Sequence, residues 1–338
     1  MKSRNILAIA AVTALVATNV SARDEIRIVG SSTVFPFSTA VAEQFGKKTD
    51  FATPVVESTG SGGGLKLFCT GVGAEHPDIA NASRRMKQKE FDLCKANGVT
   101  DIIEVKIGFD GIVIGNAIKA PAFDLTRKDI YKALAKDVSQ YGRMSENSFK
   151  TWNEVNPSLP AQAIEVLGPP PTSGTRDAFE ELAIQKGAIE AGVDKKAAKK
   201  VVVRDDGAYI ESGENDNLIV SKLEADPAKL GVFGFSFLDQ NADRIKGSKV
   251  DGVEPTFDNI ASGEYPVSRS LWFYVKKAHI GVIPGIEEYM AEFVDDDAIG
   301  EDGYAVEKGL IPLEDDERDT FRSAIGNLTV MTGKEGLH

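Results

Sequence analysis

The sequence has few of the residues on which most enzyme active sites depend. Its 338 residues include only three histidines, His76, His279 and His338, and we expect the first two to lie at the surface. A serine hydrolase needs a base beside its nucleophile. Three histidines scattered in this way do not indicate one.

Several catalytic motifs are also absent. No Gly-x-Ser-x-Gly turn surrounds Ser61, Ser173 or Ser236. The chain has no Gly-x4-Gly-Lys phosphate loop and no His-Glu-x-x-His helix. We therefore expect a binding protein rather than an enzyme, with no cofactor and no metal, and a secreted phosphatase is the least favoured alternative.

Long apolar runs are missing except at the N-terminus. There a short basic stretch, residues 1–4, precedes an apolar run over residues 6–20, which ends in small residues at 20–22. This pattern is typical of a secretory signal peptide and is too short for a membrane span. We interpret residues 1–22 as a signal peptide and expect a periplasmic, secreted protein that is not membrane-embedded.

Positive charge is in deficit, because the formal net charge is -12. Such a surface does not attract nucleic acid or anionic lipid, so we expect no nucleic-acid partner. The two cysteines, Cys69 and Cys94, are an even count in a chain that we expect to be exported, which predicts one disulfide. Two buried free thiols are the alternative.

What the sequence does contain is a repeated local pattern. A short apolar strand leads into a turn rich in Ser, Thr and Gly, and a helix follows. This occurs three times, with the turns at residues 30–33, 58–64 and 172–175. Strands that alternate with helices indicate parallel sheets, whose ligands bind at the carboxyl ends of the strands.

A hydroxyl-rich turn at the start of a helix is suited to an anion. The first turn of a helix has free N–H groups and a partial positive charge. Ser and Thr add hydroxyl donors, and Gly lets a ligand approach the backbone closely. The alternative is that each Ser or Thr only caps its own helix. Three such turns in one chain favour convergence on one anion.

The domain organisation follows from two strands of buried type, at residues 112–116 and 271–275. They predict a chain that leaves one lobe, builds a second and returns. We expect lobe I to comprise residues 23–110 and 265–338, and lobe II to comprise residues 111–264.

The motifs at residues 30–34, 60–64, 79–83 and 173–175, in this order and spacing, resemble those of periplasmic phosphate-binding proteins. These are the PstS-type receptors of the high-affinity phosphate ABC transporter. Residues 231–234 and 265–268 fit as well. The resemblance implies an α/β, two-lobed periplasmic-binding-protein fold of type II. Two mixed or parallel sheets with flanking helices would be joined by two crossover strands.

The resemblance also implies the ligand and the partner. The ligand would be inorganic phosphate, held between the lobes, and the partner would be the membrane permease of a phosphate ABC transporter. We expect a monomer. A receptor for another tetrahedral oxyanion, such as sulfate, molybdate or arsenate, is the alternative.

The family's ligand residues carry over where this sequence matches its motifs. Thr33, Ser61 and Ser173 would supply hydroxyl groups, and the Val34 backbone would supply an N–H. The full expected phosphate-binding set is Ser32, Thr33, Val34, Ser61, Ser83, Arg84, Asp110, Ser173, Gly174, Thr175 and Arg176.

Two positions depart from the family pattern. Arg84 stands where the best-known members have the aspartate that accepts the proton of phosphate, and Pro169 stands where they have an arginine. We hypothesise that Arg84, helped by Arg176, replaces that arginine, because a guanidinium forms paired hydrogen bonds with phosphate oxygens. A surface position on the first helical turn is the alternative for Arg176.

The missing aspartate leaves the proton acceptor open. Asp110, just before the first crossover strand, is the candidate, and a hinge or capping role is its alternative. Asp205 and Asp206 are reserve candidates.

Overall fold

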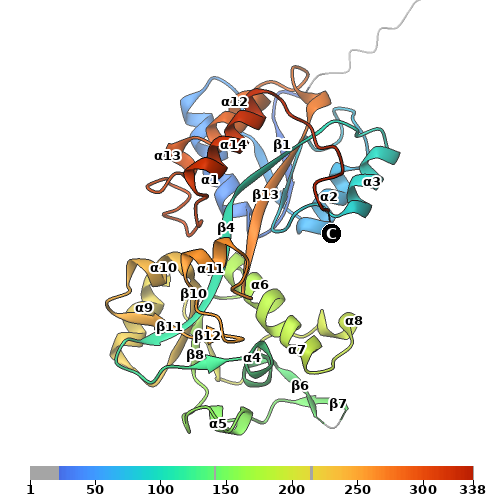
Figure 1. Cartoon of the computed structure of the whole chain (residues 1–338). Coiled ribbons are helices and arrows are strands. Elements are labelled where there is room, and N and C mark those ends of the chain that lie inside the picture. The colour runs from blue at the N-terminus through green and yellow to red at the C-terminus, as the bar shows by residue number, and fades with distance from the viewer. Residues whose placement is uncertain (1–22, 141, 214–215, 338) are drawn as a thin grey trace, which may run out of the picture.

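The computed structural model describes residues 23–140, 142–213 and 216–337, so the expected signal peptide, residues 1–22, lies outside the described residues. Figure 1 shows two α/β lobes joined by two long strands, β4 (Ile102–Ala117) and β13 (Ser268–Lys276). We call the lobe that contains the N-terminal strands lobe I and the other lobe II.

Lobe I is built on a mixed sheet in the order β2-β1-β3-β13-β4. The first three strands are parallel, whereas β13 is antiparallel to both β3 and β4. Since β1 lies between β2 and β3, the carboxyl ends of these three strands meet at one edge. Besides β4 and β13, the elements of lobe I are β1 (Arg27–Gly30), α1 (Phe35–Lys48), β2 (Val55–Ser58), α2 (Ser61–Phe68), β3 (Ile79–Ala82), α3 (Gln88–Ala96), η2 (Lys277–His279), α12 (Ile286–Phe293), α13 (Asp296–Ile299) and α14 (Asp315–Gly326).

Helices cover both faces of this sheet (Figure 1). On one face, Phe37, Val41 and Phe45 of α1 recur every four residues and are buried beside Tyr289 and Phe293 of α12. This is the apolar stripe that a period of 3.6 residues produces. On the other face, α2 and α3 bury a separate apolar cluster.

Lobe II continues from β4, which also pairs with β10 and β11. Its remaining strands extend the sheet in the order β10-β8-β9. The elements of lobe II are β5 (Asp124–Leu125), α4 (Arg127–Leu134), β6 (Asp137–Gln140), β7 (Arg143–Glu146), α5 (Trp152–Val155), β8 (Val166–Gly168), α6 (Gly174–Phe179), η1 (Glu180–Gln185), α7 (Lys186–Glu190), α8 (Lys195–Ala198), β9 (Tyr209–Glu211), α9 (Asp216–Ala225), β10 (Leu230–Gly234), α10 (Phe235–Gln240), β11 (Ile245–Gly247), β12 (Lys249–Val250) and α11 (Phe257–Ala261).

The connection between the lobes is a pair of adjacent backbone segments. Strand β4 is continuous, pairing with β13 in lobe I and with β10 in lobe II. On the return path, the Ile112 N–H donates to the Val267 carbonyl at 2.9 Å. The predicted lobe boundaries, after residues 110 and 264, fall in β4 and shortly before β13.

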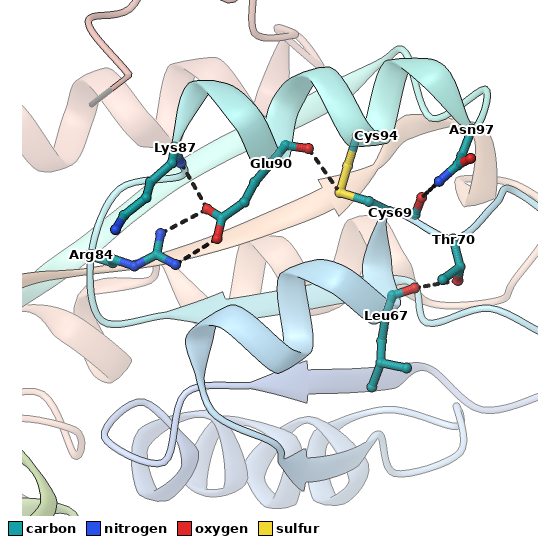
Figure 2. Close-up of a disulfide and its surroundings, with 8 residues drawn as sticks. All are labelled: Leu67, Cys69, Thr70, Arg84, Lys87, Glu90, Cys94 and Asn97. Carbon is teal, nitrogen blue, oxygen red and sulfur yellow. Dashed lines mark hydrogen bonds and ion pairs between the residues drawn. A yellow bond between two sulfur atoms is a disulfide. The ribbon is translucent and has the colours of Figure 1, made fainter. Parts of the chain in front are cut away.

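The disulfide that the two cysteines indicated is present, and it joins Cys69, just after α2, to Cys94 in α3. Figure 2 shows this link beside Asn97, whose side-chain amide donates to the Cys69 carbonyl at 2.8 Å. The link attaches α3 to the end of α2. It therefore helps to fix the position of α3 on lobe I.

The expectation that His279 lies at the surface is wrong. The residue is buried, and its Nδ1 lies 2.5 Å from Oδ1 of the equally buried Asp78. Arg23 donates to the same carboxylate at 2.7 Å. The Asp78 carboxylate thus provides the hydrogen-bond partner that the buried imidazole of His279 needs. The lysines beside His279 in the sequence had indicated a surface position instead.

Candidate functional site

Two neighbouring cavities lie between the lobes, with volumes of about 670 Å³ and about 700 Å³, and Ser32 lines both. Nearly all of the predicted site residues lie on their walls. The first cavity is lined by Ser32, Ser61, Ser83 and Arg84. The second is lined by Ser32, Thr33, Asp110, Ser173, Gly174 and Thr175.

The second and third strands of lobe I bring two hydroxyl groups together. Ser61 is the first residue of α2, and Gly60 before it has a φ of 72°, a conformation that favours glycine. Ser83 directly follows β3, and its N–H donates to Ser61 Oγ at 3.0 Å. The two hydroxyl oxygens are also 3.0 Å apart. The carboxyl edge of the sheet thus presents a compact pair of hydroxyl groups.

The turn of lobe II meets the first turn of lobe I. Ser173 caps α6, since its Oγ accepts from the Thr175 N–H at 3.2 Å. A Cβ added at Gly174 would lie 3.2 Å from the Ser32 carbonyl oxygen and 3.4 Å from the Thr33 Cα. The absence of a side chain at Gly174 therefore allows the two lobes to approach at this point.

The backbone of the first turn leads directly into α1. Val34 is buried, and its N–H lies 3.4 Å from Ser31 Oγ. Pro36 occupies the first helical turn, where its missing N–H removes no hydrogen bond. Ser31, Ser32 and Thr33 consequently lie at the N-terminus of a helix of fourteen residues.

Arg269 is the site residue that the sequence reasoning missed. It lies in β13, and its side chain is only 8% exposed on the wall of the first cavity. Its Nε is 3.3 Å from Asp110 Oδ2 and its Nη1 is 2.9 Å from Glu181 Oε2. Its Nη2 donates to the Thr33 hydroxyl. Arg269 thus connects both lobes and one of the predicted hydroxyl donors.

One signal in the sequence pointed to Arg269. It is the only charged residue in the apolar segment between residues 267 and 275. A charge in a strand of buried type needs a partner or a ligand. However, no family motif includes Arg269, and the residues that pair with Arg269 are distant from it in the chain.

Asp110 lies opposite Arg269 on β4 and is 8% exposed. Burial raises the pKa of its carboxyl, while the charge and the hydrogen bond of Arg269 oppose that rise. The reserve candidates are elsewhere. Asp205 pairs with Lys136 at 2.9 Å and Asp206 pairs with Arg204, and neither lines the two cavities.

Arg84 lies on the cavity wall but already has a partner (Figure 2). Its Nη1 and Nη2 donate to the two carboxylate oxygens of Glu90 at 2.8 and 2.7 Å. This hydrogen bonding raises the pKa of Arg84. Burial would raise the pKa of Glu90, but Arg84 and the Lys87 N–H outweigh it and lower that pKa. An anion at Arg84 would have to compete with Glu90.

Arg176 lies in lobe II, away from both cavities. It is 6% exposed, so the alternative of a surface position does not hold either. Its Nε is 2.9 Å from Glu180 Oε1, its Nη1 donates to the Pro169 carbonyl at 3.3 Å, and its guanidinium stacks on Tyr209. The helical phase after Gly174 turns this side chain toward the core rather than the cleft.

Within residues 23–140, 142–213 and 216–337, no three His, Cys, Asp or Glu side chains gather as a metal site. The helices in that same part of the chain are all too short or too polar to cross a bilayer.

The comparison with protein families agrees with this geometry. A family model described as the PBP superfamily domain matches residues 16–297. The chain belongs to this superfamily. Within it, the chain is a member of the family of PstS-type phosphate-binding proteins, as the ordered motifs indicated, and the predicted two-lobed fold is confirmed.

Relatives and solved structures are similar along most of the chain. Protein SphX of Synechococcus elongatus is 32% identical over 262 residues, which cover 74% of this chain and 69% of that protein. The phosphate-binding protein PstS of Staphylococcus saprophyticus is 30% identical over 281 residues, covering 80% and 76%. The crystal structure of a possible phosphate binding protein from Planctomyces limnophilus superposes with a TM-score of 0.75 at 30% identity. It covers 90% of this chain and 98% of that one.

Proposed function

We propose that this protein is an extracytoplasmic receptor that captures inorganic phosphate between its two lobes and delivers it to an ABC transporter for phosphate uptake. One observation carries the proposal. Hydroxyl-rich turns at three helix starts and one arginine, Arg269, whose side chain is largely covered, line adjoining cavities between the lobes. Its PstS relative is a phosphate-binding protein, which supports the same ligand.

In this proposal the anion is held mainly by neutral donors. Thr33, Ser61, Ser83, Ser173 and Thr175 supply hydroxyl groups, and the helix starts supply N–H groups and partial positive charge. In a cleft of low dielectric these short-range donors determine affinity, whereas the acidic surface is screened beyond about 8 Å. The protein can therefore bind an anion although its net charge is -12.

Arg269 replaces the arginine that the family pattern would have at Pro169. Its guanidinium already contacts the Thr33 hydroxyl and faces Asp110. Asp110 then accepts the proton of hydrogen phosphate, as the family's aspartate would at the position of Arg84. Because sulfate is fully ionised, it has no proton to place between its oxygen and this carboxylate. The two negative groups would then repel each other.

The protein carries out no reaction in this scheme. Phosphate drives closure only through its higher affinity for the closed form, which presents both lobes to the membrane permease. The N-terminal signal peptide would export the chain to the periplasm. We further propose that the protein acts as a monomer and without a cofactor.

A receptor for another tetrahedral oxyanion is the second candidate, because Arg84 stands where the aspartate would exclude sulfate. Calorimetric titration of protein without residues 1–22, cleared of bound ligand, separates the two. Phosphate, sulfate and molybdate are compared at pH 5 and pH 8. Tight phosphate binding with little sulfate binding supports the proposal. Equal binding of sulfate or molybdate would overturn it.

A further inference from the structure

The first cavity is lined by positively charged side chains that come from both lobes. Arg84 and Lys87 precede α3 and Lys89 lies within it, on lobe I. Lys186 begins α7 and Lys199 follows α8, on lobe II. We call these five residues the rim cations. They gather around one opening in a chain with 51 acidic and 39 basic residues.

The lysines of the rim differ from Arg84 in their contacts. Arg84 is paired with Glu90, but among the described residues no ion pair is formed by Lys87, Lys89, Lys186 or Lys199. The three lysines Lys89, Lys186 and Lys199 are exposed. The same wall also carries three carboxylates, from Glu90, Asp177 and Glu181, but with Arg269 six cations line it, so positive charge remains in excess.

The rim cations also repel one another across the cleft. The pKa of Lys87 is lowered, first by the charge of Arg84 and then by burial. The charge of Glu90 opposes this, while Lys89 and Lys199 of the opposite lobe add smaller repulsions. An anion between them would relieve this repulsion. Lysine is a hydrated point charge on a flexible stem, which suits brief capture of an anion rather than fixed coordination.

The lysines around α8 are divided by the fold. Lys196 and Lys200 line a separate hollow beside Asp194 and Asp137, whereas Lys199 lines the cleft. Neighbouring lysines of equal charge thus differ in whether they face the cleft.

We propose that the rim cations form an outer anion-binding subsite, which holds inorganic phosphate transiently before it reaches the hydroxyl-rich turns. The inference rests on the proposed function. An acidic protein repels phosphate at long range, and a local positive patch offsets that repulsion near the opening. The subsite would act on the rate of association more than on the final affinity.

The test compares two double variants that each remove two positive charges. Lys186→Gln/Lys199→Gln alters the rim, and Lys195→Gln/Lys196→Gln is the control away from the cleft. Stopped-flow fluorescence measures association and dissociation rates for inorganic phosphate at low and at physiological ionic strength. We expect the rim variant to associate about tenfold more slowly at low salt, with a smaller difference at physiological salt. The dissociation rate and the control should change little.

Lys87→Gln/Lys89→Gln removes the rim charges of lobe I and should slow association similarly, which keeps the test valid if the first variant folds poorly. Equal slowing by the control would show that only net charge matters and would overturn the subsite. So would an effect confined to dissociation. An equilibrium titration of the unaltered protein separates the proposed function from the proposed outer subsite. Absence of phosphate binding there refutes the proposed function itself, whereas tight binding with salt-independent association refutes only the rim.

Discussion

Replacing Arg269 tests which arginine has taken over the role lost at Pro169. Arg269→Gln removes a buried guanidinium that contacts Thr33 and faces the cavity. A hydrogen bond to a charged group contributes about 1.5–3 kcal/mol. At about 1.4 kcal/mol per factor of ten, phosphate should bind roughly 10- to 150-fold more weakly.

The same substitution leaves Asp110 without its cation. Breaking a buried ion pair by removing one partner costs about 3–5 kcal/mol of folding free energy. Arg269→Gln should therefore also lower the melting temperature, and Asp110→Asn in the same chain should recover part of that loss. Arg269→Lys keeps the charge but not the planar fork, so its affinity should be intermediate.

Calorimetry with phosphate, together with thermal unfolding of each variant, makes the comparison. Arg84→Gln is the matched control, because Arg84 lines the same cavity and also pairs with a carboxylate, that of Glu90, whereas Arg269 contacts the Thr33 hydroxyl. The reasoning fails if Arg269→Gln binds phosphate within about threefold of the unaltered protein while Arg84→Gln loses affinity about 100-fold. The original hypothesis for Arg84 would then be the correct one.

Further outcomes are expected at four sites. Asp110→Asn should allow sulfate to compete with phosphate in titrations. In the unaltered protein, phosphate binding should weaken as acid protonates Asp110. This should occur at a higher pH than for an ordinary aspartate, because the pKa of Asp110 is raised. Replacing both Cys69 and Cys94 by serine opens a loop of 25 residues and should lower the free energy of unfolding by about 3.5 kcal/mol, measured by denaturant titration. An unchanged unfolding midpoint would mean that the disulfide adds no stability. Burial lowers the pKa of Lys276 to about 8, so its charged form costs folding free energy below pH 8, and this cost disappears between pH 8 and 10.5. Lys276→Met should therefore raise the melting temperature at pH 7 and raise it less at pH 10. Equal increases at the two pH values would contradict this reasoning. Gly174→Ala places a methyl group 3.2 Å from a carbonyl of the opposite lobe and should weaken phosphate binding in calorimetry, while retained affinity would show that the lobes need not approach so closely.

The sequence predicted those parts of the site that depend on local structure. The turns at residues 30–33, 58–64 and 172–175 follow strands and precede helices, so composition and hydrophobic period locate them without tertiary information. The two lobes follow from the same reasoning, since two strands of buried type are far apart in the chain.

The sequence did not predict features that depend on distant partners. Arg269 acquires its role from Thr33 and Asp110, which are far away in the chain. Whether Arg176 faces the cleft or the core depends on helical phase and on Tyr209 beside it. The burial of His279 likewise depends on Asp78. In each case the side chain is placed by packing between elements, which local patterns do not encode.

The uninterrupted passage of β4 through both lobes limits how the protein can move. A flexible linker would act as a free joint and let the lobes sample many orientations. A strand that keeps its ladder on both sides of residues 111–112 can only twist or bend, and the neighbouring segment at Val267 stiffens it further. The two lobes are thereby confined to a narrow range of relative orientations. Little orientational entropy is left to lose on closure, so more of the contact free energy with the ligand appears as affinity.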